Sequence, residues 1–159
     1  MAVITASELK KSIAGGNFKP VYLFCGEEKY LSELYLKRLS DAIPDGGMAD
    51  FNRLVISDGK TPVSEISDYI ETYPMMSDKK ILILRDTGIL KSANEEIKNF
   101  WTETLSDIPD YIIIIFSETE VDKRSVIYKA INKVGAVAEF KHLSAADAVT
   151  RIERQALSA

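Results

Sequence analysis

Short apolar runs alternate along this chain with longer segments in which apolar residues recur at every third or fourth position. Unbroken runs are typical of strands covered on both faces of a sheet, whereas the wider spacing is typical of amphipathic helices. The runs predict strands at residues 21–25, 54–56, 81–84, 111–116 and 136–140. The spaced segments predict helices at residues 5–15, 27–43, 62–72, 92–105 and 127–134, and another that begins at Ser144.

Residues at the predicted helix starts agree with this pattern. Thr5 and Glu8 have the spacing of a capping box, in which two side chains satisfy backbone N–H groups, and so have Ser92 and Glu95. Pro62 stands where proline is favoured, at the first position of a helix. Buried strands that alternate with amphipathic helices predict an α/β fold of three layers, a mostly parallel sheet flanked by helices.

Composition indicates a soluble globular protein. The 159 residues are 46% hydrophobic and 28% charged, and the longest apolar run, residues 112–116, is far shorter than the roughly 20 residues of a membrane span. The N-terminus lacks the pattern of an export signal, so we expect a cytoplasmic protein without a membrane partner. A net charge of -4 argues against broad contact with nucleic-acid phosphates.

The cysteine and the histidine each occur once, and this limits the possible chemistry. A single Cys25 excludes an intramolecular disulfide and a cysteine-based metal site. Its position inside an apolar run predicts a buried structural thiol. His142 has no obvious serine or cysteine partner for a catalytic triad. We therefore expect no metal ion, no cofactor and no catalytic residue.

The loop after the first predicted strand is where parallel α/β folds commonly bind phosphates. A phosphate-binding loop needs a glycine-rich backbone and a lysine followed by serine or threonine. Here Gly26 is followed by Glu27, Glu28 and Lys29, and Tyr30 takes the place of the hydroxyl residue. Two carboxylates would repel an approaching phosphate, so we expect this loop to be a degenerate nucleotide site.

Acidic residues at other strand ends leave alternative functions open. Asp86 follows the run at 81–84, as the magnesium-binding acid does in P-loop enzymes, and residues 117–120 include two glutamates. A solvated strand exit explains Asp86 better than a magnesium site does, because no phosphate-binding loop accompanies it. Acidic residues such as those at 117–120 are common at helix N-termini. The alternative function is a nucleotide-dependent P-loop-like enzyme or switch domain. A flavodoxin-like signalling module is a third, for which Asp86 gives the only support.

One segment departs from the general pattern. Tyr73, Pro74, Met75 and Met76 follow a predicted helix, and the charged stretch 77–80 comes next. Pro74 ends the helix, which leaves three large apolar side chains in a loop. The methionines could fill gaps in the core, or the segment could be an exposed anchor for the apolar pocket of a partner. Composition alone favours core filling.

Two stretches resemble the N-terminal region of the DNA polymerase III delta subunit family: FKPVYLFCGEEKYL at 18–31 and YPMMSDKKILILRD at 73–86. The order and spacing of the motifs carry the resemblance, which covers nearly the whole chain. It implies that residues 1–142 form a RecA-like, AAA+-related domain with a degenerate P-loop. Residues 143–159 would be the first helix of a truncated helical (lid) domain, and the chain would belong to a longer protein.

The resemblance also implies a function. Members of this family act in clamp loading: they bind the beta sliding clamp and open it for loading onto primed DNA, while neighbouring subunits hydrolyse ATP. The clamp-binding element maps onto Tyr73, Pro74, Met75 and Met76, where relatives carry Leu-Pro-Phe-Phe or Leu-Phe. The implied partners are the clamp, the delta prime and tau/gamma subunits, mainly through C-terminal domains absent here, and primer-template DNA through the full complex.

Overall fold

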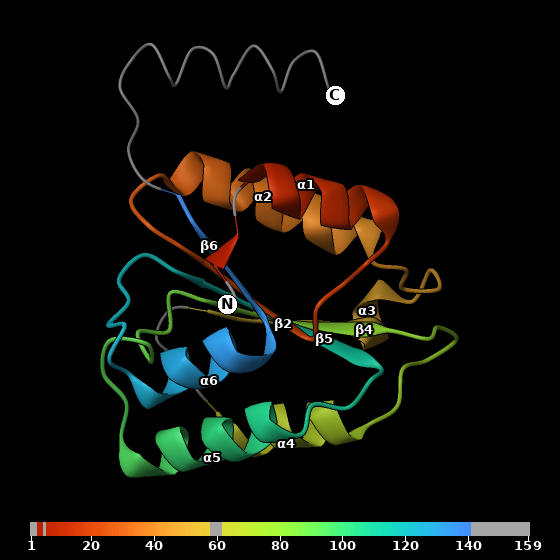
Figure 1. Ribbon diagram of the computed structural model, residues 1–159. Helices are drawn as coiled ribbons and strands as arrows, with labels where there is room; N and C mark the ends of the chain where they lie inside the picture. The colour runs from red at the N-terminus through yellow and green to blue at the C-terminus, as the bar shows by residue number, and fades with distance from the viewer. Residues whose placement is uncertain (1–2, 5, 58–61, 141–159) are drawn as a thin grey trace.

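The computed structural model describes residues 3–4, 6–57 and 62–140, and within them six strands form one parallel sheet. The strand order is β1-β6-β2-β5-β4-β3, so β2 and β5 lie at the centre and β3 is an edge (Figure 1). The strands are β1 (Val3–Ile4), β2 (Val21–Cys25), β3 (Arg53–Ser57), β4 (Lys80–Arg85), β5 (Ile112–Glu118) and β6 (Ala136–Glu139).

Helices cover both faces of this sheet. Helices α1 and α2 lie on one face, and α4, α5 and α6 lie on the other (Figure 1). This is the three-layer α/β architecture that the alternating pattern predicts. Strands covered by helices on both faces carry apolar side chains on both faces, which gives the unbroken apolar runs in the sequence. The helices are α1 (Ala6–Gly15), α2 (Lys29–Ala42), α3 (Ala49–Asn52), α4 (Val63–Glu71), α5 (Glu95–Ser106) and α6 (Val126–Val134).

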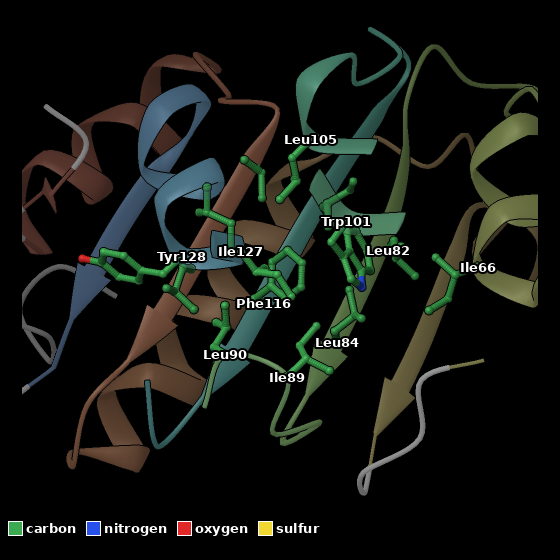
Figure 2. Close-up of a cluster of buried hydrophobic side chains, with 14 of the residues drawn as sticks. Ile66, Leu82, Leu84, Ile89, Leu90, Trp101, Leu105, Phe116, Ile127 and Tyr128 are labelled. Carbon is green, nitrogen blue, oxygen red and sulfur yellow. The ribbon is translucent and has the colours of Figure 1, made fainter. Parts of the chain in front are cut away.

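Two apolar clusters separate the layers. Trp101 of α5 is almost fully buried and packs against Phe116 of β5 with ring centroids 5.0 Å apart (Figure 2). On the other face, Tyr35 of α2 stacks on Phe140 with ring centroids 5.5 Å apart. Aromatic pairs of this kind add to the stability from area burial. The sheet is thus a rigid platform between two packed helical layers.

All five predicted strands are present, whereas two short elements were not predicted. β1 has two residues and α3 has four, too few for either periodicity to register. One predicted cap is wrong: α5 is capped by Asn94, whose side chain accepts a hydrogen bond from the Ile97 N–H, and not by Ser92. Pro62 is the N-cap of α4 and not its first helical residue, so this helix begins one residue later than expected.

Several predictions fall on residues that the structure does not describe. They concern the cap Thr5, the histidine His142, the helix from Ser144 and the proposed lid-domain residues 143–159. None of the helices in the described ranges is both long enough and apolar enough to cross a bilayer.

Candidate functional site

Residues 73–76, hereafter the contact segment, lie in the loop between α4 and β4. Tyr73, Met75 and Met76 are 78%, 45% and 80% exposed, so the methionines do not fill the core. Because the loop precedes β4, it lies at the amino end of the sheet. In the neighbouring element α3, Phe51 is also an exposed apolar side chain. The structure therefore contradicts the core-filling interpretation that composition favours.

A buried lysine fixes the start of the contact segment. Lys80 is 1% exposed, and its Nζ donates hydrogen bonds to the carbonyl oxygens of Tyr69 at 2.6 Å and Thr72 at 2.8 Å. These carbonyls lie at the end of α4, where the Tyr69 carbonyl also accepts from the Thr72 N–H at 3.3 Å. The ammonium therefore adds hydrogen bonds at the negative end of the helix. The same Nζ lies 3.6 Å from the Tyr69 ring centroid. Burial lowers the pKa of Lys80.

The rest of the contact segment is held through its backbone. The side chain of Asn52 hydrogen-bonds both the N–H and the carbonyl of Met75. Met76 has a φ of 56°, in the left-handed region that residues other than glycine rarely adopt. Tyr73 packs on Tyr111 with ring centroids 5.0 Å apart. The apolar side chains are thus exposed on a backbone that has defined contacts.

The predicted degenerate nucleotide loop lies at the opposite, carboxyl end of the sheet, directly after β2. Gly26 has a φ of 112°, and a Cβ there would lie 2.3 Å from the carbonyl oxygen of Phe140. The Glu28 N–H donates to that oxygen at 2.9 Å, and the Lys29 N–H donates to the Glu27 carbonyl at 3.1 Å. Both amides therefore bond within the protein, whereas a phosphate-binding loop directs its amides at the ligand.

The cavity beside this loop is small. It encloses about 40 Å³, compared with the several hundred that a nucleotide-sized ligand needs. Its lining comes from the loop, from α2 and from the ends of β4 and β5: Gly26, Lys29, Ser32, Glu33, Asp86, Ser117, Glu118 and Thr119. Among the residues with described positions, no three His, Cys, Asp or Glu side chains are placed to hold a metal ion.

Glu118 organises this end of the sheet. Its carboxylate is buried and accepts hydrogen bonds from the hydroxyl and N–H of Thr87 and from the Gly88 N–H at 3.2 Å. Burial raises the pKa of Glu118, and the bonds from Thr87 and Gly88 oppose that shift. Burial also raises the pKa of Cys25 to about 11, as expected for a structural thiol. The bonds from Glu118 to Thr87 and Gly88 support the loop that begins at Asp86.

Three important side chains escaped the sequence analysis. Lys80, Asn52 and Glu118 are buried polar groups whose partners lie on other segments. Lys80 was visible only as a charge beside an apolar run, and Asn52 sits in a helix too short to predict. Glu118 is one of two glutamates at residues 117–120, and the sequence does not indicate which of the two is buried.

A sequence profile of the family described as DNA polymerase III, delta subunit, matches residues 22–141. The chain belongs to this family. Its similarity to the DNA polymerase III subunit delta of Bacillus subtilis is 26% identity over 144 residues, which cover 85% of this chain and 41% of that protein. The chain thus spans less than half the length of this curated relative.

Solved structures of other proteins share the fold. The Bacillus subtilis DNA clamp loader delta protein superposes with a TM-score of 0.78 at 22% identity, covering 89% of this chain and 44% of its own. A DNA polymerase III gamma subunit-related protein of Thermotoga maritima gives 0.62 at 15% identity, covering 89% and 47%. A Thermotoga maritima RuvB gives 0.52 at 12%, covering 86% and 42%. The domain has the RecA-like, AAA+-related fold that the resemblance implied.

Proposed function

We propose that this protein acts in DNA replication as a clamp-loader subunit that binds the beta sliding clamp and opens it, without hydrolysing ATP itself. Exposure of the contact segment carries the proposal. Tyr73, Met75 and Met76 expose apolar surface. Buried Asn52 bonds the backbone of Met75, and buried Lys80 bonds the end of α4 just before the segment. Apolar anchors on an ordered backbone are typical of interface hot spots.

Methionine suits this role although it replaces the aromatic residues of relatives. Met75 and Met76 are flexible and polarisable, so they can fill an apolar pocket of irregular shape. They offer less contact area than phenylalanine, which should reduce affinity without moving the contact. To open the ring, the contact segment must bind the open clamp more tightly than the closed one, since differential affinity alone shifts that equilibrium.

The carboxyl end of the sheet supports the non-hydrolysing part of the proposal. The amides of Glu28 and Lys29 are bonded within the protein, and the adjoining cavity is about 40 Å³. Two carboxylates also flank the loop, at Glu27 and Glu28. Energy for clamp opening would then come from binding, and ATP would be hydrolysed by neighbouring loader subunits. The delta prime and tau/gamma subunits would be partners in the complex. Primer-template DNA would be contacted through the full complex.

The test is binding to a bacterial beta sliding clamp by the wild-type chain and by a Met75→Ala/Met76→Ala variant. We expect the double substitution to weaken binding by about 30-fold or more, as loss of a hot spot of roughly 2 kcal/mol does. Tyr30→Ala is the matched control, because Tyr30 is 68% exposed on α2. Tighter binding to a clamp whose ring interface has been weakened by mutation would support opening.

Three outcomes would contradict the proposal in different ways. Undiminished binding by the folded double variant would place the clamp contact outside Met75 and Met76. Absence of wild-type binding would remove the clamp function altogether. A saturable ATP signal at micromolar nucleotide would favour the alternative of a nucleotide-dependent P-loop-like enzyme or switch domain.

A further inference from the structure

Asn52 makes an unusual set of contacts for a residue in so short a helix. It is 0% exposed at the end of α3, and its Oδ1 accepts a hydrogen bond from the Met75 N–H at 2.7 Å. Its Nδ2 donates to the Met75 carbonyl at 2.6 Å and to the Asp45 carbonyl at 2.9 Å. One side chain thus satisfies both backbone groups of Met75, as a neighbouring strand would.

Gly46 supports the next residue by close approach. It has a φ of 66°, and a Cβ at this position would lie 2.1 Å from the Met76 carbonyl oxygen. Only glycine lets the two backbones meet at this distance. The contact coincides with the left-handed φ of Met76, a conformation that its own side chain disfavours. An unfavourable conformation persists only where surrounding contacts impose it.

We infer that Gly46 and Asn52 form a support that holds the contact segment in its exposed conformation, with Asn52 as a positioning residue for clamp binding. The inference rests on the proposed function. An unsupported loop would have to be ordered on binding, and ordering lowers affinity. The support would fix Met75 and Met76 before the clamp arrives, so the chain would bind as a preformed anchor.

A purely structural role for Asn52 is the competing explanation, since buried polar groups need partners in any fold. The two roles differ in what they predict. A structural role lowers stability, and any loss of binding then follows from unfolding. A positioning role lowers clamp affinity in a chain that remains folded, and it does so only while the methionines are present.

The chain offers a matched pair for this test in Gly46 and Gly47. Both have left-handed backbones, with φ of 66° and 75°, so alanine introduces similar strain at each. A Cβ at Gly46 collides with the Met76 carbonyl, whereas a Cβ at Gly47 meets nothing within 4 Å. We expect Gly46→Ala to weaken clamp binding by about tenfold and Gly47→Ala by less than about twofold.

Asn52→Ala provides the second variant, with Ser125→Ala as a control for stability. Ser125 caps α6 by accepting hydrogen bonds from the Ile127 and Tyr128 N–H groups. Loss of this cap should lower the melting temperature of the protein without altering the contact segment. We expect Asn52→Ala to weaken binding about tenfold or more, and Ser125→Ala to leave it unchanged. In a Met75→Ala/Met76→Ala background, adding Asn52→Ala should have no further effect.

Amide exchange of Met75, followed by NMR, separates failure of this inference from failure of the proposed function, because it needs no clamp. We expect slow exchange in the wild type and in Ser125→Ala, and fast exchange in Asn52→Ala. Fast exchange in the wild type would overturn the support itself. If exchange is slow in the wild type but Gly46→Ala and Asn52→Ala bind the clamp as well as the wild type does, the support has no role in binding. Slow exchange without wild-type binding would retain the support and refute the clamp function.

Discussion

The two ends of the sheet differ in what they offer to a partner. The carboxyl end carries the charged groups, yet its loop amides and the Glu118 carboxylate bond within the protein. The amino end shows Tyr73, Met75 and Met76 at the surface, and its buried Lys80 and Asn52 side chains bond the backbone beneath them. In parallel α/β folds the carboxyl end is the usual ligand site. In this chain the exposed apolar side chains of the contact segment lie at the other end.

Both ends use internal hydrogen bonds to fix the backbone, but they expose different side chains. At the carboxyl end, Gly26 lets the loop after β2 approach the backbone of Phe140, directly after β6. At the amino end a helix terminus and a loop are fixed by Lys80 and Asn52. At the carboxyl end, hydrogen bonds within the protein occupy the loop amides and the Glu118 carboxylate. At the amino end, hydrogen bonds of the same kind hold a backbone whose apolar side chains are exposed to solvent.

The largest expected effect tests the fixed amino end directly. Lys80→Met removes the ammonium that caps α4 and leaves the carbonyls of Tyr69 and Thr72 without that donor. We expect the free energy of unfolding to fall by about 2–4 kcal/mol, measured by urea denaturation. Clamp binding should also weaken, because the contact segment starts at this helix end.

Lys79→Met is the matched control for that substitution. Lys79 is adjacent, and its ammonium bonds the Asp110 carbonyl at the surface rather than in the interior. Its loss should change the unfolding free energy by less than about 0.5 kcal/mol. Equal effects from the two lysines would mean that the buried cap does not fix the amino end.

A smaller effect tests the closed carboxyl end. Because burial raises the pKa of Glu118 above its ordinary value of 4.5, ionisation of this group favours the unfolded state. The contribution of Glu118 to stability is therefore greatest below pH 4.5 and is lost as pH rises through the raised pKa. The Thr87 hydroxyl counteracts this loss by bonding the carboxylate.

Thr87→Val removes that hydroxyl and should raise the pKa of Glu118 further. We expect a destabilisation of about 1–2 kcal/mol at neutral pH and a smaller one near pH 4, where the carboxyl is protonated. Urea denaturation at both pH values measures the difference. Ser106→Ala, which removes an exposed hydroxyl at the end of α5, is the control. A pH-independent loss would show that the hydroxyl does not act through the carboxylate.

Periodicity predicts the sheet well because burial on both faces leaves long apolar runs. Residues 21–25 and 81–84 needed no tertiary information, and the structure places strands there. The N-cap of α5 was misassigned because Ser92 and Asn94 are both favourable caps, and only the backbone decides between them. Elements of two to four residues, such as α3, lie below the length at which a pattern can be recognised.

The candidate site was predicted less completely. Residues 73–76 stood out because Pro74 ends a helix before three large apolar side chains, but their exposure could not be read from composition. The support could not be predicted at all. Gly46 and Asn52 meet Met75 and Met76 across more than 20 positions in the chain, and no local rule links them.

The smallest expected effect separates backbone strain from side-chain contact at Met76. Met76→Gly and Met76→Ala both remove the exposed side chain, but glycine adopts the φ of 56° without strain. We expect the glycine variant to be more stable than the alanine variant by about 0.5–1 kcal/mol, measured by urea denaturation. Clamp affinity should fall in both, because the apolar anchor is gone.

Higher stability of Met76→Gly than of Met76→Ala, with weaker clamp binding than wild type in both, is the result expected for a strained residue whose side chain makes the contact. The control is Gly47→Ala, which introduces left-handed strain without altering an apolar side chain. It should lower stability and leave binding unchanged. If the glycine variant is no more stable than the alanine variant, the left-handed conformation of Met76 carries no strain. The amino end would then be an ordinary loop, fixed by Lys80 and Asn52 alone, and the contrast between the two ends would rest on exposure.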